Sequence, residues 1–323
     1  MPITEVTSDS TTLTMTVIAE FDAPVERLWH AYTDPRQIEK FWGPPTYPAT
    51  FYQHDVFPGG LSKYAMTGPE GDVSRGYWEW IDIKAPHSFV VIDGFALDDG
   101  SPNSDMPSMR MEFSFESIDA GSRVTTTTYF GSAEELEQLL AMGMDEGMRA
   151  AMGQIDEILA DLTSFAAGIA TEVQILTDTR VRISRVIRGS IEAVWAAFNE
   201  PDLLKKWQLG PDGWTMPVCE VGSRVGDTYR TEWAQPDGSG RFGFTGEILE
   251  ISPPSRLVTT EAMIGMEDTK VINELTLTQA EGGTLASYLI TYPSLELRDT
   301  ILATGMTDGM ESSFARMEAV VLR

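Results

Sequence analysis

The sequence predicts an α+β protein built from two tandem copies of one domain, each a curved antiparallel sheet with a long helix against its concave face. An internal repeat is the first observation behind this prediction: "DAPVERLWHAYTDP" at residues 22–35 aligns without gaps with "RGSIEAVWAAFNEP" at residues 188–201. The second is that "GMDEGM", beginning at Gly143, is answered by "GMTDGM", beginning at Gly305. The repeating unit is far longer than the roughly 20–50 residues of stacked repeats, so we expect two domains rather than a solenoid.

Each copy begins with a strand-like segment, "TTLTMTVIAEF" at residues 11–21 and "VRISRVIR" at residues 181–188. Two short helices are expected after this first strand. The first of them begins at Pro24 or at Ser190, because Pro suits the first turn of a helix and Ser suits its N-cap. The second follows a further proline in each copy and ends near a Gly-Pro pair.

Several segments of strand character follow in each copy, separated by turns such as "GPEGD" and "PDGSG". Residues 109–117 and 271–279 alternate apolar and polar residues, as half-buried strands do. Each copy then closes on a long helix, expected over residues 133–162 and 294–322, with one apolar stripe along it. The stripes contain Met144, Met148, Met152, Ile155 and Leu159 in the first copy and Met306, Met310, Phe314, Met317 and Val321 in the second.

The domain boundary is expected near Gly168. This glycine follows a long helical pattern and suits a helix stop, and a new strand-like run starts near Thr179. We therefore expect the first domain at residues 1–165, a linker at 166–178 and the second domain at 179–323.

Composition limits the classes of partner. The chain has 23 Lys and Arg against 49 Asp and Glu, a net charge of −26, and such a surface repels phosphate backbones and anionic headgroups. We therefore expect neither nucleic acid nor membrane as a partner. No run of about 18 apolar residues occurs, and the N-terminus lacks the features of a secretory signal. Cys219 is the single cysteine, which favours a reducing, cytoplasmic setting.

Sequence motifs give no sign of a metal or cofactor. The chain's three histidines, His30, His54 and His87, are scattered through the first copy, and no His/Cys cluster has zinc spacing. His54 and Asp55 are adjacent on an expected strand, so their side chains point to opposite faces and cannot form a simple dyad. We find no P-loop, dinucleotide fingerprint or G-x-S-x-G elbow, and we expect no cofactor and no metal.

Several ordered blocks resemble a known family. "APVERLWHAYTDPRQIEKFWGP", "FPGGLSKYAM" and the "GMDEGM" helix of the first copy look like the SRPBCC (START-like) superfamily, as do "IEAVWAAFNEPDLLKKW" and "GEILEISPPSRLVTTEAM" of the second. The nearest branch is the domain shared by activators of Hsp90 ATPase and calicheamicin-resistance proteins. The resemblance implies a helix-grip fold that encloses a hydrophobic cavity between sheet and long helix. Relatives bind lipids, polyketides, hormones or other apolar ligands, and some catalyse reactions on them.

On this resemblance we expect an apolar cavity in each domain. Trp78 and Trp80 share one face of a strand and could stack on a planar ligand or pack against a neighbour, and both readings remain open. Tyr64, Arg110, Tyr229 and Arg241 are the polar groups expected to orient a ligand. The full set of expected ligand-binding residues is Trp42, Tyr64, Trp78, Trp80, Arg110, Met144, Met148, Trp207, Tyr229, Trp233, Arg241, Phe244, Met306 and Met310.

The leading hypothesis is a protein that binds an apolar small molecule in each domain. The alternative is an enzyme of polyketide-cyclase or hydrolase type, in which an Asp/His or Tyr/Glu pair converges inside a cavity with perturbed pKa values. A role like that of the Hsp90 activators is a third possibility, disfavoured because the chain consists of two such domains without the extra N-terminal domain of those co-chaperones. The sequence leaves open whether the protein is an enzyme.

Overall fold

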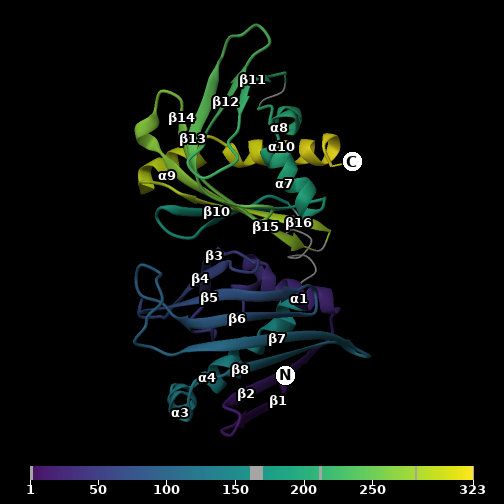
Figure 1. The fold of residues 1–323 in the computed structure, drawn as a ribbon, viewed down its shortest axis with the longest axis vertical. Helices are drawn as coiled ribbons and strands as arrows, with labels where there is room; N and C mark the ends of the chain where they lie inside the picture. Colours follow the sequence, from purple (N-terminus) through teal and green to yellow (C-terminus); the bar gives the residue numbers. More distant parts are fainter. Residues whose placement is uncertain (1–2, 161–169, 211–212, 281, 323) are drawn as a thin grey trace. The chain divides into compact units, whose positions relative to one another are not determined.

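The computed structural model describes residues 3–160, 170–210, 213–280 and 282–322. It divides the chain into two compact units, Met1–Thr163 and Ser164–Arg323, which we call the first and second domains. Within the described residues, each domain contains one antiparallel eight-stranded sheet together with helices (Figure 1).

The first sheet has the strand order β1-β2-β8-β7-β6-β5-β4-β3. Its strands are Ile3–Asp9 (β1), Thr14–Phe21 (β2), Ala49–His54 (β3), Leu61–Thr67 (β4), Val73–Lys84 (β5), Ser88–Phe95 (β6), Ser108–Ile118 (β7) and Gly121–Tyr129 (β8). The helices of this domain are Val25–Thr33 (α1), Pro35–Ile38 (α2), Ala133–Ala141 (α3), Met144–Met152 (α4) and Ile155–Ala160 (α5).

The second sheet repeats that order, as β9-β10-β16-β15-β14-β13-β12-β11. Its strands are Glu172–Ile175 (β9), Arg180–Ile187 (β10), Thr215–Glu220 (β11), Thr228–Ala234 (β12), Phe242–Ser252 (β13), Arg256–Met263 (β14), Val271–Ala280 (β15) and Gly283–Thr291 (β16). The helices are Ile191–Asn199 (α7), Pro201–Trp207 (α8), the 3₁₀ turn Glu267–Thr269 (η1), Leu295–Leu302 (α9) and Met306–Val320 (α10). The shared order confirms the predicted tandem α+β architecture.

The two edge strands β1 and β9 were not anticipated. β1 pairs with β2, and β9 pairs with β10. β9 lies inside the segment expected to be a linker, so the described part of residues 166–178 includes a strand of the second sheet. Short edge strands carry a weak sequence signal because only one of their faces is packed.

The long terminal helix of each domain is interrupted at a glycine, which corrects the expectation of unbroken helices over 133–162 and 294–322. Gly143 has φ 83° and separates α3 from α4, and Gly305 has φ 77° and separates α9 from α10. This left-handed conformation favours glycine because it lacks a Cβ atom. The repeated Gly-Met pair therefore marks the corner at which α4 begins in the first domain and α10 begins in the second. In the first domain a second break at Gly153 follows α4.

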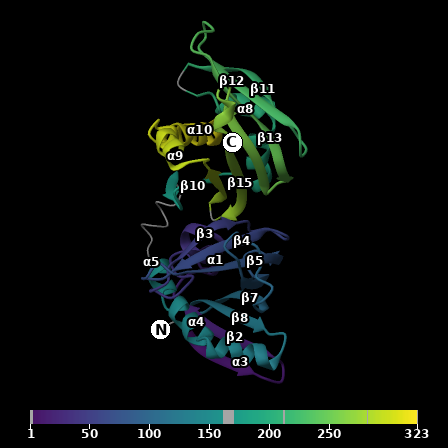
Figure 2. The ribbon, with the colours of Figure 1, turned by 90° about the vertical axis from the view of Figure 1, so that its left-hand side faces the viewer.

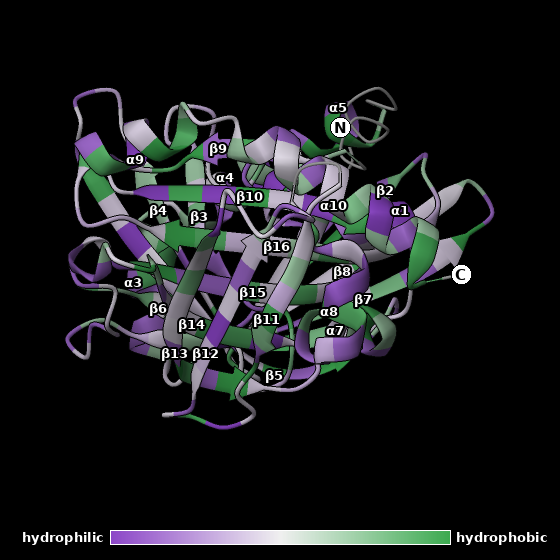
Figure 3. Ribbon diagram, turned by 90° about the horizontal axis from the view of Figure 1, so that it is seen from above, coloured by the Kyte–Doolittle hydropathy of each residue, from purple (hydrophilic) through white to green (hydrophobic). Residues whose placement is uncertain are grey.

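Each core lies between the inward face of its sheet and its helices. Inward and outward residues alternate along β2 and β7, and Figure 3 shows alternating hydrophobic and hydrophilic segments along several strands. In the second domain α10 packs beside α8 and contacts β10 (Figure 2). No helix in the described part of the chain is long and apolar enough to cross a membrane.

Candidate ligand-binding site

A carboxylic acid points into the first domain from β6. The side chain of Asp93 accepts a 2.8 Å hydrogen bond from Trp78 Nε1 and a 3.1 Å hydrogen bond from Tyr64 Oη. Burial of its carboxyl raises the pKa of Asp93 to about 6, although the two hydrogen bonds act in the opposite direction. Asp93 is thus an inward acid whose neighbours come from the adjacent strand β5 and from β4 on the far side of β5.

Aromatic rings fill the space around Asp93. Trp78 and Trp80 are fully buried, and Phe89 stacks on Phe113 with ring centroids 4.5 Å apart. Trp42 packs edge-on against Trp78 at 4.6 Å. Other buried rings of the same interior are Trp29, Tyr32, Phe41, Phe51, Tyr64 and Phe115. These side chains form one aromatic group between the first sheet and its helices.

A histidine and a tryptophan of this interior share one serine. Ser62 Oγ lies 2.8 Å from His54 Nδ1 and accepts a 2.8 Å hydrogen bond from Trp80 Nε1. His54 and Trp80 are therefore fixed by one serine of β4. This arrangement supports the packing reading of Trp80, because its one polar atom is bonded within the protein.

The second domain has an acid at the equivalent strand position, Glu261 of β14. Tyr229 Oη lies 3.2 Å from Glu261 Oε2 and 3.0 Å from the carbonyl oxygen of Thr260, so its single proton is shared between two acceptors. Burial raises the pKa of Glu261, and hydrogen bonds from Asn273 and Tyr229 oppose the rise. The acid and the phenol come from strands separated by β13.

Two further tyrosines lie within electrostatic reach of Glu261. Burial raises the pKa of Tyr229 and Tyr288 far above the ordinary value, and the negative charge of Glu261 adds to both shifts. The same two causes, opposed by Arg298, raise the pKa of Tyr292 to about 12. Three phenols therefore surround this carboxyl and remain protonated at any physiological pH.

The polar atoms around Glu261 are not all satisfied. Within the described ranges, no Lys or Arg forms an ion pair with Glu261, and no positive charge contributes to its pKa. Asn273 Oδ1 is buried and has no hydrogen-bond donor among the described residues. The hydroxyl of Tyr292, whose residue is 2% exposed, is likewise without a partner in that part of the chain.

A tyrosine over a glycine is common to both sites. Tyr64 pairs with Gly76, and a Cβ atom on Gly76 would lie 2.3 Å from the Tyr64 ring. Tyr229 pairs with Gly246, where a Cβ atom would lie 2.6 Å from the Tyr229 ring and 1.8 Å from the Thr260 carbonyl oxygen. Each glycine therefore lets a phenol lie flat across the sheet and reach the acid on the strand beyond.

The residue that stands opposite the acid on the neighbouring strand differs between the two domains. Trp78 pairs directly with Asp93. Thr245 pairs with Ala262, so Gly246 stands opposite Glu261. The second domain thus has a glycine where the first has the indole that donates to the acid, and its interior lacks that ring.

The inward residues of the second domain are less completely covered. Leu257 and Leu275 form the cross-strand pair that corresponds to Phe89 and Phe113, and Leu257 is only partly buried. Other partly buried side chains that pack against the core clusters of this domain are Trp195, Phe198, Tyr288, Met306 and Met310. Trp42, Met144 and Met148 of the first domain are partly buried as well, so the difference between the two interiors lies in the missing rings.

The structure brings some of the expected first-domain residues together. Trp42, Tyr64, Trp78 and Trp80 belong to one aromatic group. Met144 and Met148 of α4 pack against the same core as partly buried side chains.

Arg110 is not part of that group. It lies on the outward face of β7, where it forms an ion pair with Glu112 and lies over the ring of Tyr129.

In the second domain, only part of the expected set lies near Glu261. Tyr229 bonds to it directly, and Met306 and Met310 pack in the cluster that contains Tyr288 and Tyr292. The other four expected residues lie elsewhere: Trp207 is buried against α10, Trp233 and Phe244 share a separate aromatic group with Phe242, and Arg241 pairs with Glu232.

Sequence reasoning missed Asp93, Glu261, Asn273, Tyr288 and Tyr292. One signal could have found the acids, because the aligned strands "SFVVIDGF" and "RLVTTEAM" carry an acid at the same position.

The fold defines the structural class of the protein. An antiparallel sheet that surrounds a C-terminal helix, built twice in tandem, is the architecture of helix-grip proteins.

The chain belongs to the family described as Activator of Hsp90 ATPase homolog 1-like protein, whose model matches residues 22–160 and 188–321. A comparison with curated proteins gave no match.

Solved structures with similar folds come from several bacteria. Protein Ms6760 from Mycobacterium smegmatis is 49% identical, covers 50% of this chain and 98% of its own length, and has a TM-score of 0.47. A protein from Arthrobacter aurescens is 40% identical over 49% of this chain and 92% of its own length, with a TM-score of 0.47. Each covers about half of the present chain.

Proposed function

We propose that the chain binds an apolar small molecule inside the second domain, between the inward face of its sheet and α10. The family commonly binds hydrophobic ligands, which supports this class of function. The observation that carries the proposal is the incomplete cover of the second interior, where Gly246 and the pair Leu257 and Leu275 replace the large aromatic residues of the first domain.

Apolar burial supplies the affinity. Met306 and Met310 are unbranched and polarizable, so they adapt to ligands of different shape. Burying about 400 Å² of ligand surface at about 25 cal/mol per Å² contributes about 10 kcal/mol, and association costs at least about 4 kcal/mol of it. The remaining ~6 kcal/mol corresponds to a Kd in the range of tens of micromolar.

The first domain has a different role in this proposal. Its sheet and helices enclose an aromatic group, and we propose that the packing of these rings contributes stability. A cavity there, expected from the family resemblance, stays a prediction. We also place the protein in the cytoplasm, on the basis of its single cysteine.

A second candidate function is acid–base catalysis in the same interior. Tyr229 and Glu261 converge within 3.2 Å and both have perturbed pKa values, which is the combination expected for a catalytic pair. Under this alternative a bound ligand leaves with a changed mass, which mass spectrometry of the released molecule detects. The Hsp90-related role stays a prediction, tested by the effect of the purified chain on Hsp90 ATPase activity.

Titration with Nile red, a neutral apolar dye, tests the leading proposal. We expect one dye per chain, and at least tenfold weaker binding in the double variant Leu257→Phe/Leu275→Phe, which introduces the ring pair of the first domain. Ile272→Phe adds a ring on the outward face of β15 and is the matched control, with unchanged binding expected. Absence of dye binding, or binding that the double variant leaves intact, contradicts the proposal.

A further inference from the structure

We infer that Glu261 and Asn273 form the polar end of the second-domain site and bind the protonated amino group of an amphipathic amine. The inference rests on the proposed function and specifies its ligand class. An ammonium group carries a positive charge and several N–H donors and has no acceptor. Two features of this interior correspond to those properties: the charge of Glu261 and the acceptor atoms around it.

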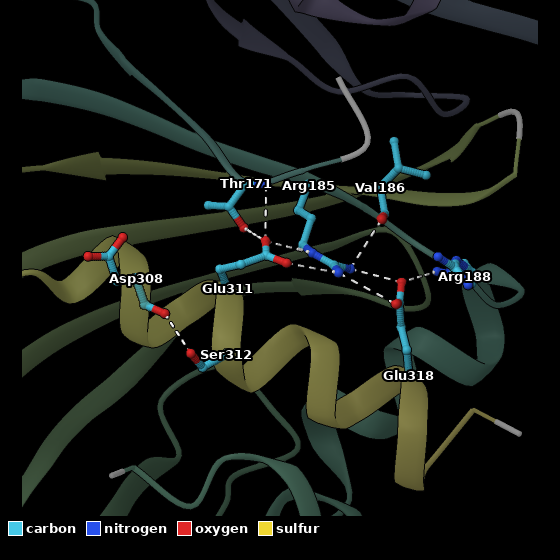
Figure 4. Close-up of polar contacts among 8 residues, drawn as sticks. All are labelled: Thr171, Arg185, Val186, Arg188, Asp308, Glu311, Ser312 and Glu318. Atoms are coloured by element: carbon cyan, nitrogen blue, oxygen red, sulfur yellow. Dashed lines mark hydrogen bonds and ion pairs between the residues drawn. The ribbon is translucent and has the colours of Figure 1, made fainter. Parts of the chain in front are cut away.

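The charge of Glu261 is the first such feature. A carboxylate that faces the interior is costly unless a cation or several donors compensate it. In the same domain the chain provides such compensation for Arg185, which lies between Glu311 and Glu318 of α10 (Figure 4). Glu261 has no such ion partner among the described residues. A ligand ammonium at hydrogen-bond distance would supply the missing charge.

The acceptor atoms are the second feature. Asn273 lies on β15 across from Thr259 of β14, and its buried Oδ1 lacks a donor within the described chain. Tyr229 has only one proton, which Thr260 and Glu261 already share. An unmet acceptor beside a carboxylate favours a ligand that donates more than one hydrogen bond, and disfavours a ligand carboxylate or phosphate.

The surroundings favour a cation as well. The phenols of Tyr229 and Tyr288 lie within electrostatic reach of Glu261, and an aromatic ring attracts an ammonium group that binds over its face. Arg298 is the cation, among the described residues, whose charge acts on Tyr292, and it is bonded to Asp299 and to the Thr177 carbonyl oxygen. The net charge of −26 further raises the local concentration of cationic ligands.

The acid of the first domain has different neighbours. Asp93 receives one hydrogen bond from Trp78 and one from Tyr64, and Trp78 stands directly opposite it in the strand pairing. Glu261 stands opposite Gly246 instead, and among the described residues the nearby Oδ1 of Asn273 lacks a donor.

Three ligands with the same alkyl chain test the inference: decylammonium, decanol and decanoate, each titrated against Nile red bound to the full chain. We expect decylammonium to displace the dye at least tenfold more tightly than decanol, and decanoate to bind most weakly. In Glu261→Gln the amine should lose this advantage while decanol retains its affinity. Glu247→Gln removes one exposed charge from the outward face of β13 and should leave the preference unchanged.

The outcomes separate the two proposals. If none of the three ligands nor the dye binds, the proposed function fails. If decanol or decanoate binds as tightly as the amine to the wild-type chain, the apolar site stands and the amine assignment is overturned. Comparing the three ligands on the wild-type chain tests the amine assignment even if Glu261→Gln folds poorly.

Discussion

The two domains place an acid at the same position of the same strand and surround it differently. Asp93 faces Trp78 and receives hydrogen bonds from an indole and a phenol, whereas Glu261 faces Gly246 and lacks the indole. The comparison teaches that the residue opposite the acid on the neighbouring strand, Trp78 or Gly246, decides whether the acid receives a hydrogen bond from an indole.

The domains also hold their terminal helices differently. In the second domain Arg185 of β10 bonds to Glu311 and Glu318 and lies over the ring of Phe314. In the first domain the aligned strand position is Ala19, and the helix is divided into α4 and α5. The ion pairs of Arg185 therefore add to the packing of Phe314 and Met317 in holding α10.

The largest expected effect comes from Trp78→Ala. Removing this fully buried indole leaves a large cavity and takes one donor from Asp93, so we expect about 3–5 kcal/mol lower stability of the first domain. The stability of the second domain should stay within about 0.5 kcal/mol of wild type. Hydrogen exchange followed by mass spectrometry, compared for peptides of β5 and β13, measures both effects. Equal loss of protection in both domains is the contrary result.

A smaller loss of stability, in the second domain, is expected from Arg185→Met, which keeps the apolar stem of the side chain and removes its charge. Breaking a buried ion pair usually costs about 3–5 kcal/mol, and the partial exposure of Glu311 reduces the expected loss to about 2–3 kcal/mol. Urea unfolding of the second domain measures it, with the exposed Arg224→Met as control.

The same variant should change the dependence of stability on pH. Burial tends to raise the pKa of Glu318 and Glu311, but the hydrogen bonds from Arg185 prevail and hold both pKa values below the ordinary range. The stability from these contacts is therefore present above the ordinary pKa of glutamate and is lost as pH falls through the lower, folded pKa. Arg185→Met should lack this acid-dependent loss, and an unchanged acid profile would count against the ion-pair account.

The smallest expected effect on stability comes from the titration of Asp93. Its pKa is raised to about 6 in the folded chain, so the stability linked to its protonated form is present below its ordinary pKa and is lost as pH rises towards 6. The rise of this pKa from its ordinary value to about 6, discounted for the partial exposure of the carboxyl, corresponds to about 1–2 kcal/mol of folding stability. Asp93→Asn should abolish this decline between about pH 4 and 6. A carbon-13 NMR titration of the Asp93 carboxyl that gives an ordinary pKa would refute it.

The fold was predictable because it rests on signals that recur. Period-two alternation in "MRMEFSF" places Met109 and Met111 on one face of β7, and the repeat supplied the second domain. The same alternation puts Arg110 on the opposite face, so its expected contact with a ligand conflicted with the strand pattern. The spacing of the methionines predicted the positions of the terminal helices. It did not predict that the helices break at the left-handed glycines, Gly143 and Gly305.

The site was predictable only in part, because it depends on register across strands. Tyr229 and Glu261 come from strands separated by β13, and only the pairing of three strands brings their oxygens within 3.2 Å. An acid in a strand is ordinarily expected to face solvent, so Asp93 and Glu261 gave no local sign of pointing inward. The glycine that makes room for each tyrosine is likewise visible only once the neighbouring strand is in place.

A crystal structure of the full chain with decylamine tests the central claim most directly. The account predicts one ligand per chain, with its alkyl chain against Met306 and Met310 and its nitrogen within hydrogen-bond distance of Glu261. A ligand seated among the rings around Trp78, or a second domain whose interior is closed by its own side chains with no ligand inside, would contradict it.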